Sequence, residues 1–277
     1  MSPHNDNHAR IITALTLDGW EVCVFGHSEL CMLESGVCAG ATPLNTFDLV
    51  WMLGLGEQHD FLDRCQMLSN LPGHKLVNNP LATVFLHSKH ASLPHAPTTF
   101  SGNQPDELLA ATKRHPQINR WVIKPTAGSY GRGVKFADSH DTLRQQLVAA
   151  TADNRYCILQ AYVDEIEAGE TRSLLVNGQI IGSYLRIPNK DFLANLSQGG
   201  RARQTELDSQ QKRQVLEISN ILSLNGVRFA AIDMAFPWLI EVNIANPGGF
   251  ATLAGLEDTA SPNIGQRMAT ALRTILD

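Results

Sequence analysis

The segment FAAIDMAFPWLIEVN, Phe229–Asn243, holds two apolar runs that carry acidic and amide side chains. Two strands are predicted, one on each side of Pro237, joined by a tight turn. That turn would place Asp233 directly opposite Glu241, with their Cβ atoms about 5 Å apart. Asn243 follows Glu241 by two residues and therefore shares its face of the strand. The predicted hairpin thus gathers three oxygen-bearing side chains.

These three side chains suit a hard cation. Two facing carboxylates repel each other unless a cation or a shared proton lies between them. Asp233, Glu241 and Asn243 offer only oxygen ligands, which suit Mg²⁺, and Mg²⁺ also takes oxygens from nucleotide phosphates. The alternative is an exposed acidic hairpin with solvated side chains. The apolar runs favour burial on both faces, and a buried acidic pair without a cation is costly, so we assign a candidate metal site.

A glycine-rich loop follows the short predicted strand Trp121–Lys124. Gly128, Gly131 and Gly133 would let backbone N–H groups approach a polyanion, and Lys124 would add a charge at its phosphates. The loop lacks the Gly-Lys-Ser/Thr ending of a P-loop, and a strand rather than a helix follows, which excludes a dinucleotide fingerprint. Taken alone, a glycine-rich turn is more often an ordinary tight loop than a nucleotide site.

A basic and amide-rich stretch lies between the glycine loop and the acidic hairpin. Its members are Arg186, Asn195, Gly199, Gly200, Arg201 and Arg203. Arginine is suited to forked hydrogen bonding with carboxylate or phosphate. The alternative is a solvent loop with surface arginines, but the position of the stretch between the other two features favours a functional role.

The first third of the chain alternates predicted helices and strands. The expected elements are a helix at His8–Leu17, strands at Glu21–Phe25 and Asp48–Leu53, a helix at Gln58–Leu71 and a strand at Lys75–Val77. This alternation is typical of a small parallel α/β domain, although the chain opens on a helix.

Later segments give further local signals. Thr98–Pro116 is polar and contains Pro, Gly and Asn, which predicts a connection. Asn177-Gly178 between two apolar runs predicts a hairpin, because both turn residues must adopt positive φ. Helices are expected at Glu206–Leu224 and at Ser261–Leu276, the latter with Ser261 as its N-cap.

Composition narrows the function classes. With 43% hydrophobic and 18% charged residues, the 277-residue chain is an ordinary globular protein. A net charge of −5 gives no indication of a nucleic-acid partner. The five cysteines match no zinc spacing. No signal peptide and no membrane-length apolar stretch are evident, so we expect a cytoplasmic protein that does not act at a membrane.

The order of these features resembles bacterial glutathione synthetase and its ATP-grasp relatives. The segments that carry the resemblance are VIKP (122–125), QAYV (160–163), GETR (169–172), RIP (186–188), NLSQGGR (195–201), AID (231–233) and IEVN (240–243). Each motif is weak alone, whereas the ordered set is specific. The likeness extends from about residue 76 to the C-terminus.

The resemblance implies a mixed α/β (α+β) ATP-grasp fold with a small N-terminal parallel α/β domain. The implied divisions are a shortened N-terminal domain at 1–85, a connecting segment at 86–117, a lid subdomain at 118–165 and a C-terminal subdomain at 166–277. It also implies ATP and Mg²⁺ as cofactors, with Mn²⁺ as an alternative metal.

Individual roles follow from the resemblance as well. ATP phosphates would be contacted by Lys89 and Lys124, and covered by a lid that contains Gly128, Ser129, Tyr130, Gly131 and Gly133. Adenine would contact Gln160, Tyr162 and Val163, and the ribose would contact Glu170. The implied catalytic residues are Arg186 and Asn195, which would bind phosphate and the acyl intermediate, and Arg172, which would reach the substrate. The implied metal ligands are Asp233, Glu241 and Asn243.

The implied reaction is phosphorylation of a carboxylate by ATP, followed by attack of an amine on the acyl phosphate. Small-molecule or peptide carboxylates and amines would be the substrates, and a homo-oligomer is expected. The segments MLGLGE (52–57) and ANPGG (245–249) depart from the family pattern at its substrate side. We therefore expect a substrate pair other than γ-glutamylcysteine and glycine.

Two alternatives stay open at this point. The first is a ligase that adds an amino acid such as glutamate to a peptide or protein. The second, from another class, is a non-catalytic ATP-binding module like the synapsins. Retention of Arg186 together with Asp233, Glu241 and Asn243 argues against the second, because a scaffold need not keep both a metal set and a phosphate-binding arginine.

Overall fold

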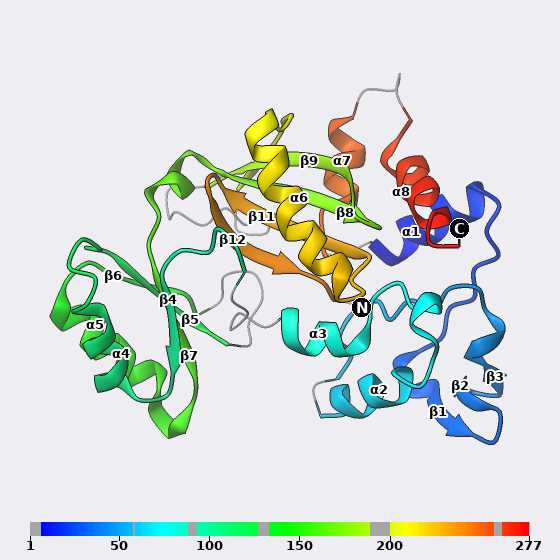
Figure 1. Ribbon diagram of the computed structural model, residues 1–277, viewed down its shortest axis with the longest axis horizontal. Coiled ribbons are helices and arrows are strands. Elements are labelled where there is room, and N and C mark those ends of the chain that lie inside the picture. The colour runs from blue at the N-terminus through cyan, green and yellow to red at the C-terminus, as the bar shows by residue number, and fades with distance from the viewer. Residues whose placement is uncertain are drawn as a thin grey trace.

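The computed structural model describes residues 7–57, 59–87, 93–126, 133–188, 200–257 and 262–276. These residues form a three-stranded, a four-stranded and a five-stranded sheet, with helices packed against them (Figure 1). Every pairing between named strands is antiparallel.

The five-stranded sheet is central and has the order β10-β9-β8-β11-β12. Its strands are β8 (Glu170–Val176), β9 (Gln179–Ile187), β10 (Arg201–Gln204), β11 (Phe229–Ala235) and β12 (Trp238–Asn243). The hairpin predicted at Asn177-Gly178 is confirmed, with φ of 45° and 78° at these two residues. The turn between β11 and β12 contains Pro237 and brings Asp233 opposite Glu241, as predicted.

Helices cover both faces of this sheet. On one face, α6 (Ser209–Leu224) packs Val215, Ile218 and Leu222 against Ile232 and its neighbours. Asp208 caps α6 by accepting hydrogen bonds from the backbone N–H groups of its first turn.

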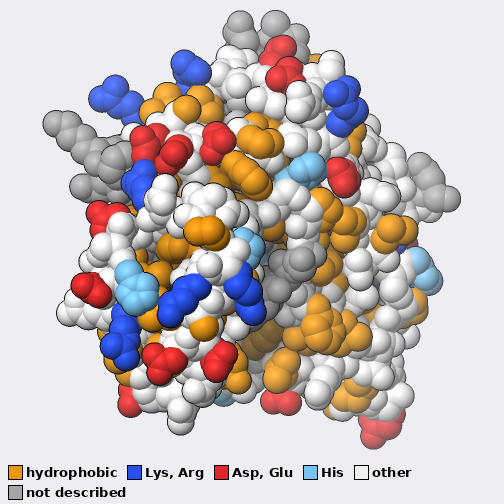
Figure 2. Space-filling view, turned by 60° about the vertical axis from the view of Figure 1, so that its left-hand side comes forward, with side chains coloured by type: hydrophobic (Ala, Val, Ile, Leu, Met, Phe, Trp, Pro, Cys, Tyr) orange, Lys and Arg blue, Asp and Glu red, His pale blue; other side chains and the backbone are white. Residues whose placement is uncertain are grey.

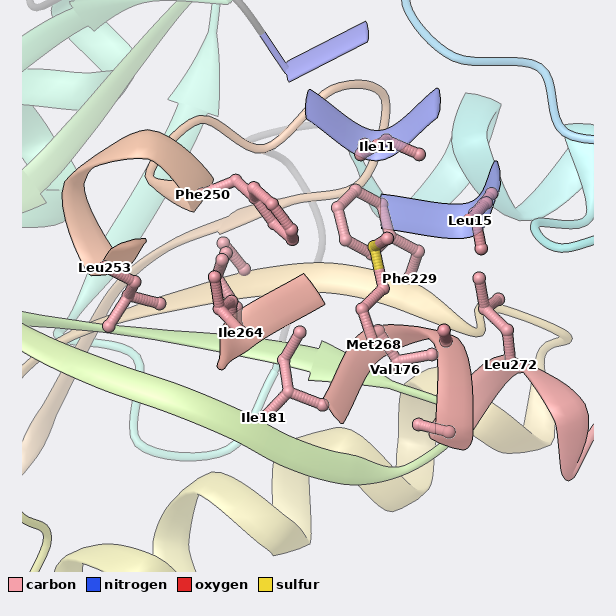
Figure 3. Packing of buried hydrophobic residues seen from close by; sticks show 14 of the residues in the cluster. Ile11, Leu15, Val176, Ile181, Phe229, Phe250, Leu253, Ile264, Met268 and Leu272 are labelled. Carbon is pink, nitrogen blue, oxygen red and sulfur yellow. The ribbon is translucent and has the colours of Figure 1, made fainter. Parts of the chain in front are cut away.

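On the other face lie α1 (Asn7–Leu17), α7 (Phe250–Leu256) and α8 (Ile264–Arg273). Figure 3 shows their apolar side chains meeting, with Phe229 of β11 between Ile11 of α1 and Met268 of α8. Asn263 caps α8; the predicted cap Ser261 lies outside the described residues.

The four-stranded sheet has the order β4-β7-β5-β6 and its own apolar core. It consists of β4 (Thr99–Gly102), β5 (Trp121–Pro125), β6 (Lys135–Ala137) and β7 (Cys157–Ala161), with α4 (Pro105–Thr112) and α5 (His140–Ala150) packed together on it. The segment predicted as a connection therefore contains β4 and α4. Its polar side chains gave no strand signal, because β4 is an edge strand held by backbone pairing to β7. The predicted domain boundaries stay predictions.

The N-terminal part differs most from expectation. No strand forms at Glu21–Phe25; instead β1 (Leu30–Leu33), β2 (Gly36–Ala39) and β3 (Thr42–Pro43) make an antiparallel meander. Parallel pairing among the described residues is limited to one bridge, Val50 to Leu76. Two short helices, α2 (Phe61–Leu68) and α3 (Pro80–Leu86), complete this part. Glycines at positive φ turn the chain after β1 and β2, which an alternating helix–strand pattern does not reveal.

Asn78 joins the N-terminal part to the central sheet. Its buried amide donates to the carbonyl oxygens of Phe229 (2.8 Å) and Ile244 (3.1 Å). Its oxygen accepts from the backbone N–H groups of Arg228 (2.9 Å) and Phe229 (2.8 Å). One side chain therefore satisfies four backbone groups beside β11 and β12.

The surface is mixed in charge. Figure 2 shows acidic and basic side chains interspersed on one face, with hydrophobic side chains gathered between them. Within the described ranges, every helix is too short or too polar to cross a lipid bilayer.

Candidate active site

A row of polar side chains crosses the central sheet where its apolar core ends. The strand registers pair Tyr184 with Arg172, Arg172 with Asp233, and Asp233 with Glu241. Directly opposite residues on adjacent strands point to the same face, so four strands place these groups side by side.

Asp233 is the centre of this row. Arg172 donates two hydrogen bonds to the Asp233 carboxylate, from Nε to Oδ1 (2.7 Å) and from Nη2 to Oδ2 (2.6 Å). Arg186 Nη2 lies 2.8 Å from Asp233 Oδ2. Burial acts to raise the pKa of Asp233, but the two guanidinium groups outweigh it and lower the pKa to about 2. Asp233 is therefore a permanent anion at physiological pH.

Glu170 completes the network. It lies opposite Arg186 in the β8–β9 register and forms an ion pair with Arg186 Nη2. Two buried carboxylates and two guanidinium groups thus balance each other, as buried charges must. Arg186 Nε is buried and has no hydrogen-bond partner among the described residues, so one donor of this guanidinium remains for a ligand.

The three side chains predicted to hold Mg²⁺ lie together at β11 and β12. Asn243 Nδ2 lies 3.2 Å from Asp233 Oδ2, and Glu241 faces Asp233 across the hairpin. Ionised carboxylate and amide oxygens are the ligands that Mg²⁺ takes alongside phosphates. The predicted repulsion between Asp233 and Glu241 is relieved here by Arg172 and Arg186, so a cation would share Asp233 with these guanidinium groups.

Lys124 and Gln160 meet on the four-stranded sheet. Lys124 Nζ donates to Gln160 Oε1 at 2.6 Å, and Gln160 Nε2 donates to Thr99 Oγ1 at 2.9 Å. Both residues come from the adjacent strands β5 and β7, and two predicted nucleotide contacts therefore stand together.

Tyr162 turns its ring toward Arg120. The guanidinium carbon of Arg120 lies 3.8 Å from the ring centroid, and the hydroxyl donates to Glu167 Oε1 at 2.9 Å. Burial, together with this hydrogen bond, raises the pKa of Tyr162 to about 12. The Tyr162 side chain is thus already engaged by Arg120 and Glu167.

The family model for prokaryotic glutathione synthetase, ATP-grasp domain, matches residues 89–258. The chain belongs to this family. It is 26% identical to the glutathione synthetase of Prochlorococcus marinus subsp. pastoris, over 90% of this chain and 82% of the relative. It is 30% identical to the glutathione synthetase of a Nostoc species, over 79% of this chain and 69% of the relative.

Two solved structures share the fold over nearly the whole chain. The chain matches D-cycloserine synthetase DcsG with a TM-score of 0.67 at 16% identity, over 97% of this chain and 94% of that one. It matches the ATP-grasp ligase PsnB, complexed with precursor peptide PsnA2 and AMPPNP, with a TM-score of 0.66 at 16% identity, over 99% and 96%. The predicted ATP-grasp fold is confirmed, and this glutathione synthetase-family protein is an ATP-dependent ligase.

Some predicted site residues of this family member lie outside the described residues: Lys89, Gly128, Ser129, Tyr130, Gly131 and Asn195. Gly133 is described and has φ of +76°. Val163 is buried beside Tyr162. Arg172 was predicted to reach the substrate, and its guanidinium is hydrogen-bonded to Asp233. Glu170 was predicted to hold the ribose, and it forms an ion pair with Arg186.

Residues 52–57 contain no basic side chain, but basic side chains from elsewhere in the fold lie against them. Gly54 N donates to Ala245 O at 2.8 Å, which sets residues 52–57 against the segment after β12. Arg64 of α2 donates to the carbonyl oxygens of Leu55 and Glu57, and His27 lies against the same turn. Inspection of residues 52–57 alone missed both, because neither belongs to that segment and no motif marks them.

Proposed function

We propose that this ligase joins a carboxylate to an amine through an acyl phosphate. The observation that carries the proposal is the buried network of Asp233, Arg172, Arg186 and Glu170, with Glu241 and Asn243 beside it. Such a network holds charged groups in fixed positions, which suits phosphoryl transfer, where positioning and charge neutralisation dominate.

In the first step, a substrate carboxylate oxygen attacks the γ-phosphorus of ATP, and the bond to the ADP oxygen breaks. Arg186 would donate its remaining Nε–H to the transferring phosphoryl group. The ion pairs with Glu170 and Asp233 would keep the Arg186 guanidinium in position. Lys124 would neutralise the phosphates from the opposite sheet. Asn195 would assist Arg186.

In the second step, the amine nitrogen attacks the acyl carbon, the carbon–oxygen bond to phosphate breaks, and the amine loses a proton. Asp233, Glu241 and Asn243 would hold Mg²⁺, which neutralises phosphate charge when bound. Nucleotide binding would also involve Lys89, Gln160, Tyr162, Val163 and the 128–133 loop.

The substrate pair differs, in this proposal, from γ-glutamylcysteine and glycine. Residues 52–57 and 245–249, which depart from the family pattern, meet through the Gly54–Ala245 hydrogen bond. The two segments that differ from the family pattern therefore lie together near Arg172. The Nη1 group of Arg172 donates to Gly248 O at 3.0 Å. A change in a pocket wall alters which substrate is bound without altering the phosphoryl chemistry.

ADP release tests this function. The protein would be incubated with ATP and Mg²⁺ against amino acids, dipeptides and γ-glutamyl compounds, including γ-glutamylcysteine with glycine and a peptide with glutamate. Turnover that requires both a carboxylate and an amine is expected, with the amide product seen by mass spectrometry. Efficient glutathione formation would overturn the substrate proposal, and ADP release without any amide product would overturn the ligation proposal.

A further inference from the structure

The chain enters the four-stranded sheet through a short segment that runs along the edge of the central sheet. This entry segment, residues 93–98, comes directly before β4, and β12 is the edge strand of the central sheet. Leu239 N of β12 donates to His95 O at 2.8 Å, and Leu93 packs against the apolar cluster between α6 and the sheet. The entry segment is therefore held on the central sheet shortly before the chain crosses to the other sheet.

The His95 side chain contacts α6 through both of its ring nitrogens. Nε2 lies 2.9 Å from Glu217 Oε2, and Nδ1 lies 3.3 Å from Gln214 Nε2. An ionised carboxylate only accepts and an amide nitrogen only donates, so these partners fit the tautomer that carries its proton on Nε2. Gln214 Nε2 also donates to Pro237 O, at 3.5 Å, in the turn between β11 and β12. One imidazole thus joins the entry segment to a helix and to the neighbouring hairpin.

The backbone of His95 also depends on its surroundings. Its φ of 64° lies in the left-handed region, which costs free energy for any residue with a Cβ atom. Such a conformation persists where the surrounding structure holds it. The hydrogen bond from Leu239 and the contact with Glu217 hold His95 from its backbone and from its side chain, so we attribute the conformation to them.

Beyond its held part, the entry segment contacts the strands that carry two predicted nucleotide contacts. Ala161 N of β7 donates to Thr98 O at 2.8 Å. Gln160 Nε2 donates to Thr99 Oγ1 at 2.9 Å, and Lys124 Nζ donates to Gln160 Oε1 at 2.6 Å. The chain and these hydrogen bonds therefore connect the contacts on α6 to Lys124 and Gln160.

We propose that His95 is a positioning residue for nucleotide binding. Its contacts with α6 fix the entry segment, and so set Lys124 and Gln160 relative to the Asp233 network on the central sheet. This rests on the proposed function, because it takes Lys124 and Gln160 as nucleotide contacts. The side chains of His95 and Glu217 are 25% and 56% exposed, and pairs of this kind are weak, so the expected effects are severalfold.

Three variants separate the contact from the fold. His95→Asn cannot reach α6 but keeps a residue type that tolerates the left-handed region. Glu217→Ala removes the partner at an exposed position and leaves the entry segment unaltered. Asn220→Ala, exposed on the same helix, is the matched control. By NMR without nucleotide, exchange of the Leu239 amide should be about fivefold faster in the first two variants and unchanged in the control.

Isothermal titration with AMPPNP and Mg²⁺ measures the positioning. Kd should rise about fivefold in His95→Asn and in Glu217→Ala. The double variant should bind no more weakly than the weaker single variant, because both changes remove one contact. In ADP release, KM for ATP should rise while kcat at saturating ATP stays within about twofold. A purely structural role would instead lower the midpoint of urea unfolding and leave Kd and KM unchanged.

The outcomes distinguish this proposal from the nucleotide site itself. Leu239 exchange within about twofold of wild type in both variants would overturn the role of the His95 contact. Faster exchange with wild-type Kd, or additive losses in the double variant, would overturn the positioning role alone. Wild-type protein that fails to bind AMPPNP would overturn the nucleotide site and the positioning role with it, whereas Leu239 exchange would still decide the contact. If His95→Asn does not fold, Glu217→Ala decides by the same two measurements.

Discussion

At the scale of single residues, Asp233 is the buried carboxylate that forms ion pairs with two arginines. It is 1% exposed and bears a full negative charge between Arg172 and Arg186. Removing the charge leaves two buried guanidinium groups facing a neutral amide, which costs about 3–5 kcal/mol when a buried pair is broken.

Asp233→Asn is therefore expected to abolish ADP release and to lower the thermal midpoint at pH 7. The pKa of Asp233 is depressed to about 2 from 3.8, so its stabilisation is complete above the unfolded value and is lost as pH falls toward 2. Calorimetry between pH 7 and pH 3 should show the midpoints of wild type and variant converging below about pH 4. Parallel curves throughout this range would contradict the assignment.

Lys124 and Lys135 form a second test at this scale. Lys124 donates to Gln160 from the interior of the sheet, whereas Lys135 is exposed at the start of β6. Lys124→Ala should weaken ATP binding at least about tenfold, the value of one charge-assisted contact, and Lys135→Ala should not. Isothermal titration with an ATP analogue measures both. Equal losses in the two variants would rule out the special role of Lys124.

The limits of sequence reasoning are visible in the same residues. The pairing of Asp233 with Glu241 was predictable, because a short turn fixes the register of two neighbouring strands. The ion pair between Arg172 and Asp233 was not predictable. The two residues are 61 positions apart in the chain, and only the sheet order brings β8 next to β11. The motif resemblance gave Arg172 a role at the substrate, whereas its geometry adds a role in fixing Asp233.

At the scale of elements, the packing of α1 on α8 depends on a glycine. A Cβ atom added to Gly265 would lie 2.8 Å from Ala14 Cβ, closer than such atoms approach, whereas one added to Gly255 of α7 would meet nothing within 4 Å. The two helical glycines therefore form a matched pair.

Gly265→Ala is expected to destabilise the protein by about 1–3 kcal/mol through overpacking. Gly255→Ala should be neutral or stabilising by up to about 1 kcal/mol, because alanine is the better helix former. Urea unfolding of both variants gives the comparison. A stabilised Gly265→Ala would mean that α1 does not pack on α8 as described.

Elements differ in how well local sequence predicts them. The Asn177-Gly178 hairpin and α6 have turn and capping residues that act locally, and both were predictable. β4 and β10 are short edge strands whose side chains are mostly polar or exposed. Their formation depends on backbone pairing, of β4 to β7 much later in the chain and of β10 to β9. The β1–β3 meander is made of strands too short to show a period.

At the scale of the whole molecule, the N-terminal part is joined to the central sheet by apolar packing and also by a set of polar contacts. Asn78 satisfies four backbone groups there, and Arg228 Nη1 donates to Leu76 O at 2.8 Å and to His74 O at 3.0 Å. These contacts hold residues 74–78 of the N-terminal part against the central sheet that carries Arg172.

Asn78→Ala is expected to cost about 2–4 kcal/mol, because it leaves several buried backbone groups without partners. Asn70→Ala removes only exposed bonds at the end of α2 and should change the free energy of unfolding by less than about 0.5 kcal/mol. Chemical denaturation measures both. A loss confined to KM for the carboxylate, with unchanged stability, would show that Asn78 positions the wall without supporting the fold.

The contact between α1 and α8 has a consequence for synthesis on the ribosome. Ile11 and Leu15 bury their side chains against Met268 and Leu272, so a helix made early packs on a helix made some 250 residues later. Throughout translation of the intervening chain, the apolar face of α1 lacks its native partner, and this is the period in which nascent chains are open to aggregation and to chaperone binding. The apolar face of α1 can therefore be covered only once α8 has emerged from the ribosome, so this side of the fold is completed last.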